Sequence, residues 1–171
     1  MTSLSRGWAE QVRQLFVDAR TQRDLWMARL PDDLRALLPL DATPLAQGIE
    51  LLADAVGVGP RIAAAQREQS RANAAVLHGR VFGRGAPLSQ DTALAAFADG
   101  AHVRDGLLVQ LAEAVDGAEL KGEVEALLEH APAPAPDAPV EQRRAALAAV
   151  FAAQEQAVLL CAERLDAIER G

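Results

Sequence analysis

The C-terminal part of this chain carries the pattern that most constrains its fold. After the segment Pro132–Pro139, the chain continues to Gly171 without another Gly or Pro. Seam positions then recur at alternating spacings of four and three: Leu147, Phe151, Gln154, Val158, Cys161, Leu165 and Ile168. This spacing is typical of a helix whose narrow apolar seam is covered by other helices. The pattern therefore predicts a helical bundle, with Gln154 as a polar interruption of the seam.

The composition supports the same fold class. Half of the residues are apolar, but only 4% are aromatic and none is Tyr. The apolar residues are mostly Ala, Leu and Val, and Ala and Leu are strong helix formers. A β protein of this size normally carries more β-branched and aromatic residues. We therefore expect an all-α fold, an antiparallel helical bundle of about four long helices plus shorter connecting helices.

Capping residues, Gly and Pro divide the first half of the chain into helices. Ser3 or Ser5 is a plausible N-cap for a first helix, which Pro31 ends. Thr43 is expected to cap another helix, which Gly57 closes. A further helix then runs from 60 to about 82.

Three Asp-Gly pairs follow, at 99–100, 105–106 and 116–117. Asp-Gly normally marks a turn. The helical period here places at least one pair inside a helix, where Gly costs about 1 kcal/mol relative to Ala. We expect one helix to end at Gly117 and a shorter one to run from about Leu120 to His130.

The length of 171 residues is typical of one domain. A chain of this size can bury about 70% of its unfolded surface, so its core needs no disulfide or metal. We expect residues 1–131 to form the bundle and residues 132–139 to form a Pro/Ala linker. Residues 140–171 then form a long C-terminal helix that packs on the same bundle.

The net charge of −7 is unevenly distributed. Residues 1–90 carry eleven Arg against nine acidic residues, whereas residues 91–171 carry six basic against fifteen acidic residues. Binding to nucleic acid depends on many Lys or Arg that displace counterions, so the acidic balance argues against it. The asymmetry instead predicts that the two halves attract one another, within a chain or across a dimer.

The sequence predicts a soluble cytoplasmic protein. No basic and apolar leader opens the chain, and we expect no apolar run to approach the roughly 18 residues that span a bilayer. The single cysteine, Cys161, lies on the apolar seam and is expected to be a buried thiol. Lys121 is the only Lys beside sixteen Arg, which with the abundant Ala suggests a bacterial protein.

A polar stripe in the helix 60–82 is the first candidate site. It comprises Gln66, Gln69, Ser70 and Asn73. If these side chains meet Gln154 in one layer, they form either a buried network that fixes register or a pocket for a small polar ligand. The alternative is that Gln66 and Asn73 face solvent.

A small anion is the second candidate ligand. His78, Arg80 and Arg84 lie among three Gly at the end of the same helix. Guanidinium groups match phosphate and carboxylate oxygens, and Gly lets the backbone approach a ligand. However, the helix dipole favours Arg at a helix C-terminus without any ligand.

Metal binding and nucleophilic catalysis have weaker support. No Glu-x-x-His pair is present, and His78, His102 and His130 lie on three different helices. These three histidines form a metal site only if the fold brings them together. Ser70 and His78 share a helix face but lie about 12 Å apart. We therefore assign no catalytic residue, no metal ligand and no cofactor.

The leading functional prediction is a non-enzymatic protein-interaction or regulatory module. Its first expected partner is itself, as a homodimer, and the second is another protein. The alternative is a bundle that binds an anionic small molecule, or a small enzyme, through Arg80, Arg84 and His78. A metal-binding bundle comes third. No membrane is expected as a partner.

Overall fold

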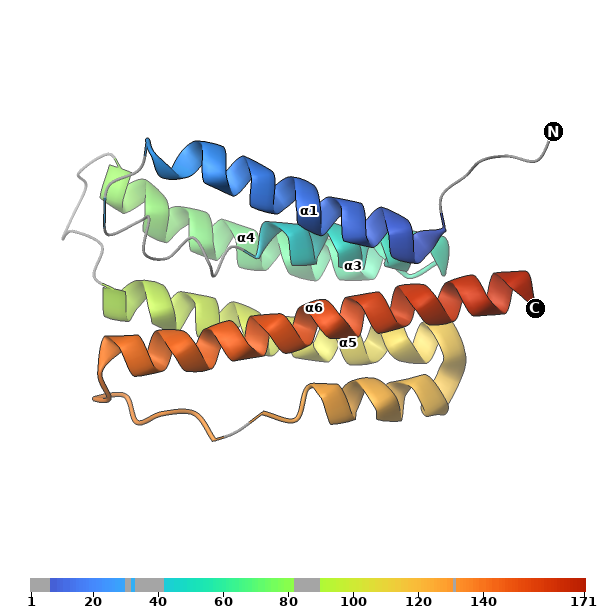
Figure 1. The fold of residues 1–171 in the computed structure, drawn as a ribbon. Coiled ribbons are helices and arrows are strands. Elements are labelled where there is room, and N and C mark those ends of the chain that lie inside the picture. Colours follow the sequence, from blue (N-terminus) through green and yellow to red (C-terminus); the bar gives the residue numbers. More distant parts are fainter. Residues whose placement is uncertain (1–6, 30–31, 33–41, 82–89, 131) are drawn as a thin grey trace.

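The computed structural model describes residues 7–29, 32, 42–81, 90–130 and 132–171, with side chains except for 26, 70, 72–81 and 90–92. Within these ranges there are helices and no strand. The helices are α1 (Trp8–Met27), α3 (Thr43–Ala55), α4 (Gly59–Val81), α5 (Gln90–Leu127) and α6 (Val140–Arg170). They pack side by side as an antiparallel bundle (Figure 1), so the predicted all-α class is confirmed.

The C-terminal helix α6 is the central element. It packs mainly against α5, and also against α1 and α3. Six of its seven seam residues are buried: Leu147, Phe151, Gln154, Val158, Cys161 and Leu165. The seventh, Ile168, is 45% exposed.

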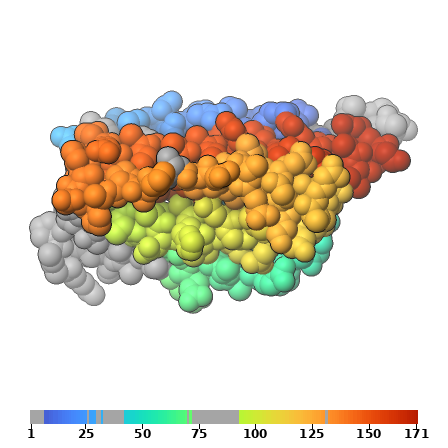
Figure 2. Space-filling view, turned by 90° about the horizontal axis from the view of Figure 1, so that it is seen from below, coloured from blue at the N-terminus to red at the C-terminus, as the bar shows by residue number. Residues whose placement is uncertain are grey.

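Helix α5 is broken into two segments at Asp116–Gly117, where the sequence predicted a helix end. Gly117 has φ +65° and ψ −154°, a conformation that is accessible almost only to Gly. We call residues 90–115 the first segment and residues 118–127 the second segment. The chain reverses direction between them (Figure 1). Seen from below, the second segment lies at the surface, with α6 on one side of it (Figure 2).

A side chain of α6 stabilises this reversal. The Arg164 guanidinium donates through Nη1 to Asp116 Oδ2 at 2.7 Å and through Nη2 to Glu123 Oε2. These two hydrogen bonds to carboxylates raise the pKa of Arg164 above its ordinary value. Arg164 thus joins α6 to the break in α5 and to its second segment. The other two Asp-Gly pairs lie inside the first segment.

The N-terminus of α1 is capped from another helix. The backbone N–H groups of Trp8 and Ala9 donate to Asp166 Oδ1 and Oδ2 at 2.7 and 3.0 Å. The carboxylate therefore binds orphan amides and lies at the positive end of the helix dipole. The predicted caps Ser3 and Ser5 lie outside the described residues.

The start of α3 corrects the predicted cap at Thr43. Thr43 is the first helical residue, and the N-cap is Ala42, which makes no side-chain hydrogen bond. Pro44 lies in the first turn, where its fixed φ favours a helix start without a capping side chain. Gly57 closes this helix with φ +81°, and α4 begins at Gly59, as predicted.

Gly48 lets α3 approach α6 closely. A Cβ at this position would lie 3.1 Å from Val158 Cγ1 and 3.8 Å from Val12 Cγ1. The absence of a side chain therefore brings three helices together at one buried point. The core is continuous around this junction, with Ile49 and Leu52 fully buried beside it.

The expectation that no stretch is long and apolar enough to cross a membrane was wrong. Within the described residues, α6 alone contains an 18-residue window with a mean hydropathy of 1.6 and at most two charged residues. Gln154, Glu155 and Gln156 lie in this helix, and polar groups are costly in the centre of a bilayer. The same helix buries one face against α5, α1 and α3.

Candidate functional site

Gln154 is the centre of a buried polar layer. Its side chain is fully buried on α6, where the seam pattern places an apolar residue. Its Oε1 accepts a hydrogen bond from Arg104 Nε at 3.0 Å. Its Nε2 donates to the Ala101 carbonyl and to Asp105 Oδ1, both at 2.8 Å. Gln154 thus bonds to one turn of the first segment of α5, which fixes the register between the two helices.

Arg104 is the charged member of this layer. Its side chain is only 5% exposed, and its guanidinium carbon lies 4.6 Å from the centre of the Phe151 ring. Burial lowers the pKa of Arg104 to about 10, although the nearby Asp105 charge opposes this shift. Its Nη2 is buried and has no hydrogen-bond partner in the described part of the chain. A cation held by a neutral amide and a ring is costly to bury.

Asp105 and His130 extend the layer to the surface. Asp105 Oδ2 lies 3.3 Å from His130 Nε2, and both side chains are about one quarter exposed. His130 follows the second segment of α5, so this contact ties both segments to Gln154. His102, in contrast, is exposed. No group of three His, Cys, Asp or Glu side chains that could hold a metal occurs among the described residues.

Part of the polar stripe of α4 lies beside the polar layer around Gln154. Gln66 is buried, and its Nε2 donates to the Ala46 carbonyl of α3 at 3.2 Å, while its Oε1 has no partner in the described part of the chain. Gln69 is half-buried and lies against Gly100, where a Cβ would meet Gln69 Nε2 at 3.3 Å and Arg104 Nη1 at 3.4 Å. Gln69 therefore lies next to the polar layer around Gln154, whereas Gln66 hydrogen-bonds to α3.

The other predicted ligand residues fall where the structure gives no side chains. His78 and Arg80 lie on α4, but their side chains are outside the described part, as is that of Asn73. Arg84 lies outside the described residues altogether. The anion site at these positions stays a prediction. Arg104 and Asp105, which the sequence analysis did not select, are the charged residues that hydrogen-bond to Gln154.

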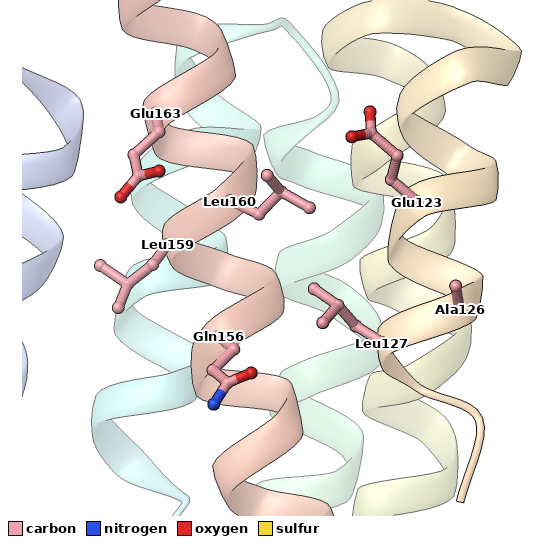
Figure 3. A pocket seen from close by; sticks show the side chains of 7 residues that line it. All are labelled: Glu123, Ala126, Leu127, Gln156, Leu159, Leu160 and Glu163. Carbon is pink, nitrogen blue, oxygen red and sulfur yellow. The ribbon is translucent and has the colours of Figure 1, made fainter.

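An open groove lies between the second segment of α5 and α6. It has a volume of about 560 Å³. Its lining residues are Glu123, Ala126, Leu127, Gln156, Leu159, Leu160 and Glu163. Leu127 and Leu160 point into the space between the two helices from opposite walls (Figure 3). The groove is therefore apolar in its centre, with carboxylates at one end.

An apolar ridge lies along the α1 side of α6, and its residue Leu159 also lines the groove. Leu159 and Glu163 point towards α1 (Figure 3), and Val17 of α1 is 47% exposed. Two ion pairs join the helices here: Arg13 to Glu163 at 2.9 Å and Arg20 to Glu155 at 3.4 Å. Val17 lies between the two arginines in sequence, and Leu159 lies midway between the two glutamates. The ion pairs thus place Val17 and Leu159 at the same height along the bundle axis.

These ion pairs also bear on the predicted attraction between the two halves. Both join an arginine of the basic half to a glutamate of the acidic half. Their side chains are exposed, and exposed pairs contribute about 0–1 kcal/mol each. The attraction is therefore present within one chain, but it adds little to the stability of the fold.

The outer face of α6 carries a second seam between the ridge and the groove. It runs through Ala145, Ala149, Ala152, Gln156 and Leu159, again at alternating spacings of four and three. All are exposed except the half-buried Leu159.

Comparison with known protein families, curated sequences and solved structures finds no match to this chain. The surface therefore has to be interpreted from its own geometry.

Proposed function

We propose that this protein is a non-enzymatic interaction module that self-associates through the face made by α1, α6 and the second segment of α5. The observation that carries the proposal is the open groove, whose leucines are only half-buried at the surface of a small domain. Uncovered apolar grooves beside exposed apolar residues are typical of protein-binding surfaces.

Two further features support the proposal. The polar layer around Gln154 fixes the register of the first segment of α5 against α6, and the contact of Asp105 with His130 joins this layer to the end of the second segment, which is one wall of the groove. The same wall is held by Arg164, which binds Glu123 at the rim. A preformed surface costs less conformational entropy on binding than a mobile one. A cytoplasmic location is part of the same proposal, supported by the burial of the α6 seam inside the bundle.

Sedimentation equilibrium over a range of concentrations tests the proposal. The wild type should show a dimer that dissociates on dilution. Leu159→Glu places a charge on the face and should shift the protein to monomer, while its circular dichroism stays helical. Val103→Glu is the matched control, because Val103 is an exposed apolar residue of the first segment of α5 and does not line the groove. A wild type that stays monomeric at all concentrations would refute the proposal.

A further inference from the structure

Arg104 is a buried cation to which no carboxylate of the described residues hydrogen-bonds. Its side chain is 5% exposed, and its Nε donates to the neutral amide oxygen of Gln154 at 3.0 Å. The guanidinium carbon lies 4.6 Å from the centre of the Phe151 ring. The adjacent Asp105 accepts from the Gln154 amide through Oδ1 and faces His130 through Oδ2. The Asp105 carboxylate therefore offsets the charge of Arg104 without bonding to it.

The guanidinium of Arg104 also keeps unused donors. Its N–H groups lie in a rigid planar fork, so they cannot turn independently towards different acceptors. Nη2 is buried and has no hydrogen-bond partner within the ranges that the structure describes. Nη1 lies beside Gly100, where an added Cβ would be 3.4 Å from Nη1 and 3.3 Å from Gln69 Nε2. The missing side chain at Gly100 thus lets α4 and α5 bring two nitrogen donors close together.

We infer that this layer binds a small monovalent anion, of the size of a halide ion, at Nη2 of Arg104. The inference is independent of the proposed self-association. A buried water would satisfy the N–H groups but would leave the cation without a bonded counter-ion, which is unfavourable in a protein interior. An anion satisfies the hydrogen bonds and the charge together.

The electrostatic balance at Arg104 supports an anion over a water. Burial lowers the pKa of Arg104 to about 10, even though the nearby charge of Asp105 acts to raise it. The through-space attraction to Asp105 therefore does not make up for the hydration that the guanidinium loses. A second negative charge, in direct contact with Nη2, would act in the same direction as Asp105.

The contacts of the guanidinium select a single-atom ion over a carboxylate or a phosphate. Those larger anions bind a guanidinium best through two parallel N–H bonds. Here Nε already donates to Gln154, and Nη1 lies beside Gly100. Only Nη2 is left, which matches an ion that needs one point of contact. Chloride is such an ion, and bromide is its heavier substitute.

Gln66 provides a comparison within the same region. It lies on α4, one turn before Gln69, and its side chain is 6% exposed. Its Nε2 donates to the Ala46 carbonyl, while its Oε1 is buried and has no partner in the segments described. A carbonyl oxygen is an acceptor, so it attracts a water rather than an anion. Removing the Gln66 amide should therefore leave anion binding in place.

Bromide tests the site directly in the full-length protein. Crystals of the wild type soaked in sodium bromide should show an anomalous peak within hydrogen-bonding distance of Arg104 Nη2. Gln66→Met is the matched control and should show the same peak. The double variant Arg104→Met with Gln154→Leu should show none, and it removes both partners of the buried hydrogen bond, so that neither is left unpaired in the core. A water at Nη2 in the wild type, or bromide at exposed arginines as an adventitious ion only, overturns the inference.

Thermal unfolding tests the same site in solution. When sodium chloride replaces sodium gluconate at constant ionic strength, the Tm of the wild type and of Gln66→Met should rise, because an ion that binds only the folded state stabilises it. The double variant should show less than half of this rise. Equal rises in the wild type and the double variant overturn the inference. A bromide peak in crystals together with equal rises would show binding at crystal concentration only, which also overturns it.

Discussion

Gln154 of α6 and Arg104 of α5 form a hydrogen bond of 3.0 Å in the core, between an amide oxygen and a guanidinium N–H. The amide is the only side-chain acceptor that the described part of the chain supplies to this cation. Buried cations usually bind carboxylates, and here Asp105 binds the amide instead. The pair therefore makes the register of α5 against α6 depend on a single neutral side chain.

Replacing Gln154 should show how strongly the packing of α5 against α6 depends on this side chain. Gln154→Leu leaves the buried guanidinium without its acceptor and should lower the free energy of unfolding by about 3 kcal/mol. The double variant Arg104→Met with Gln154→Leu removes both partners and should recover most of that loss. Urea denaturation of the two variants checks the prediction. A double variant that is less stable than Gln154→Leu alone would contradict it.

The break in α5 predicts opposite effects at two glycines of one helix. Gly117→Ala forces an L side chain into a strained conformation and should destabilise the protein by about 1–3 kcal/mol. Gly122→Ala lies in the second segment, with open space around its Cβ position, and should stabilise the protein by up to about 1 kcal/mol. Thermal unfolding of both variants tests this, and equal shifts in Tm would argue against the break.

The cap on α1 should contribute measurably to stability. Asp166→Ala removes the acceptor of two backbone amides and should cost about 1–2 kcal/mol. Glu169→Ala is the control, because it removes only an exposed hydrogen bond to the Trp8 indole, and it should change stability by less than about 0.5 kcal/mol. Chemical denaturation compares the two. Similar losses in both variants would show that the cap is not the source of the effect.

Burial raises the pKa of the Cys161 thiol to about 12, from an ordinary value of 9.0, although the Arg164 charge opposes this shift. The folded thiol should therefore react with a disulfide reagent at pH 8 only after denaturation. The unfolded thiol ionises near pH 9 and the folded one near pH 12. The wild type should thus lose stability relative to Cys161→Ala as the pH rises through this range. Arg104 is present in both proteins, so its own titration cancels. A constant stability difference from pH 8 to pH 11 would contradict the assignment.

Two substitutions on α1 test the ridge. Val17→Glu places a charge on the α1 part of the face through which we propose that the protein self-associates, and the dissociation constant of the dimer should rise about tenfold or more. Leu25→Glu changes the more exposed residue, at 65%, on a side of α1 that we place outside the interface. Its effect on dissociation should be less than about threefold. Equal weakening by both variants would indicate an interface elsewhere.

The fold was predictable where the physical signal is local. The seam of α6 indicates a buried face because its spacing matches the helical period, and Gly117 indicates a helix end because few other residues adopt its conformation. The caps were less predictable. Asp166 binds the amides of Trp8 and Ala9 from a position 158 and 157 residues away, and no local pattern signals such a contact.

The polar layer was predictable only in part. Gln154 interrupts an apolar seam, which indicates a buried polar group in need of partners. The partners themselves are Arg104 and Asp105, about fifty residues earlier in the chain. Their sequence neighbourhood resembles any solvated helix turn, because burial depends on how α5 packs. The groove has no sequence signal for the same reason: it exists only after the second segment of α5 folds back along α6.

The most direct test of self-association is native mass spectrometry of the untagged wild type in a dilution series. The account predicts a species of twice the 18.1 kDa chain mass that gives way to the monomer on dilution. A single 18.1 kDa species at every concentration, or a monomer that retains a bound small molecule, would contradict it.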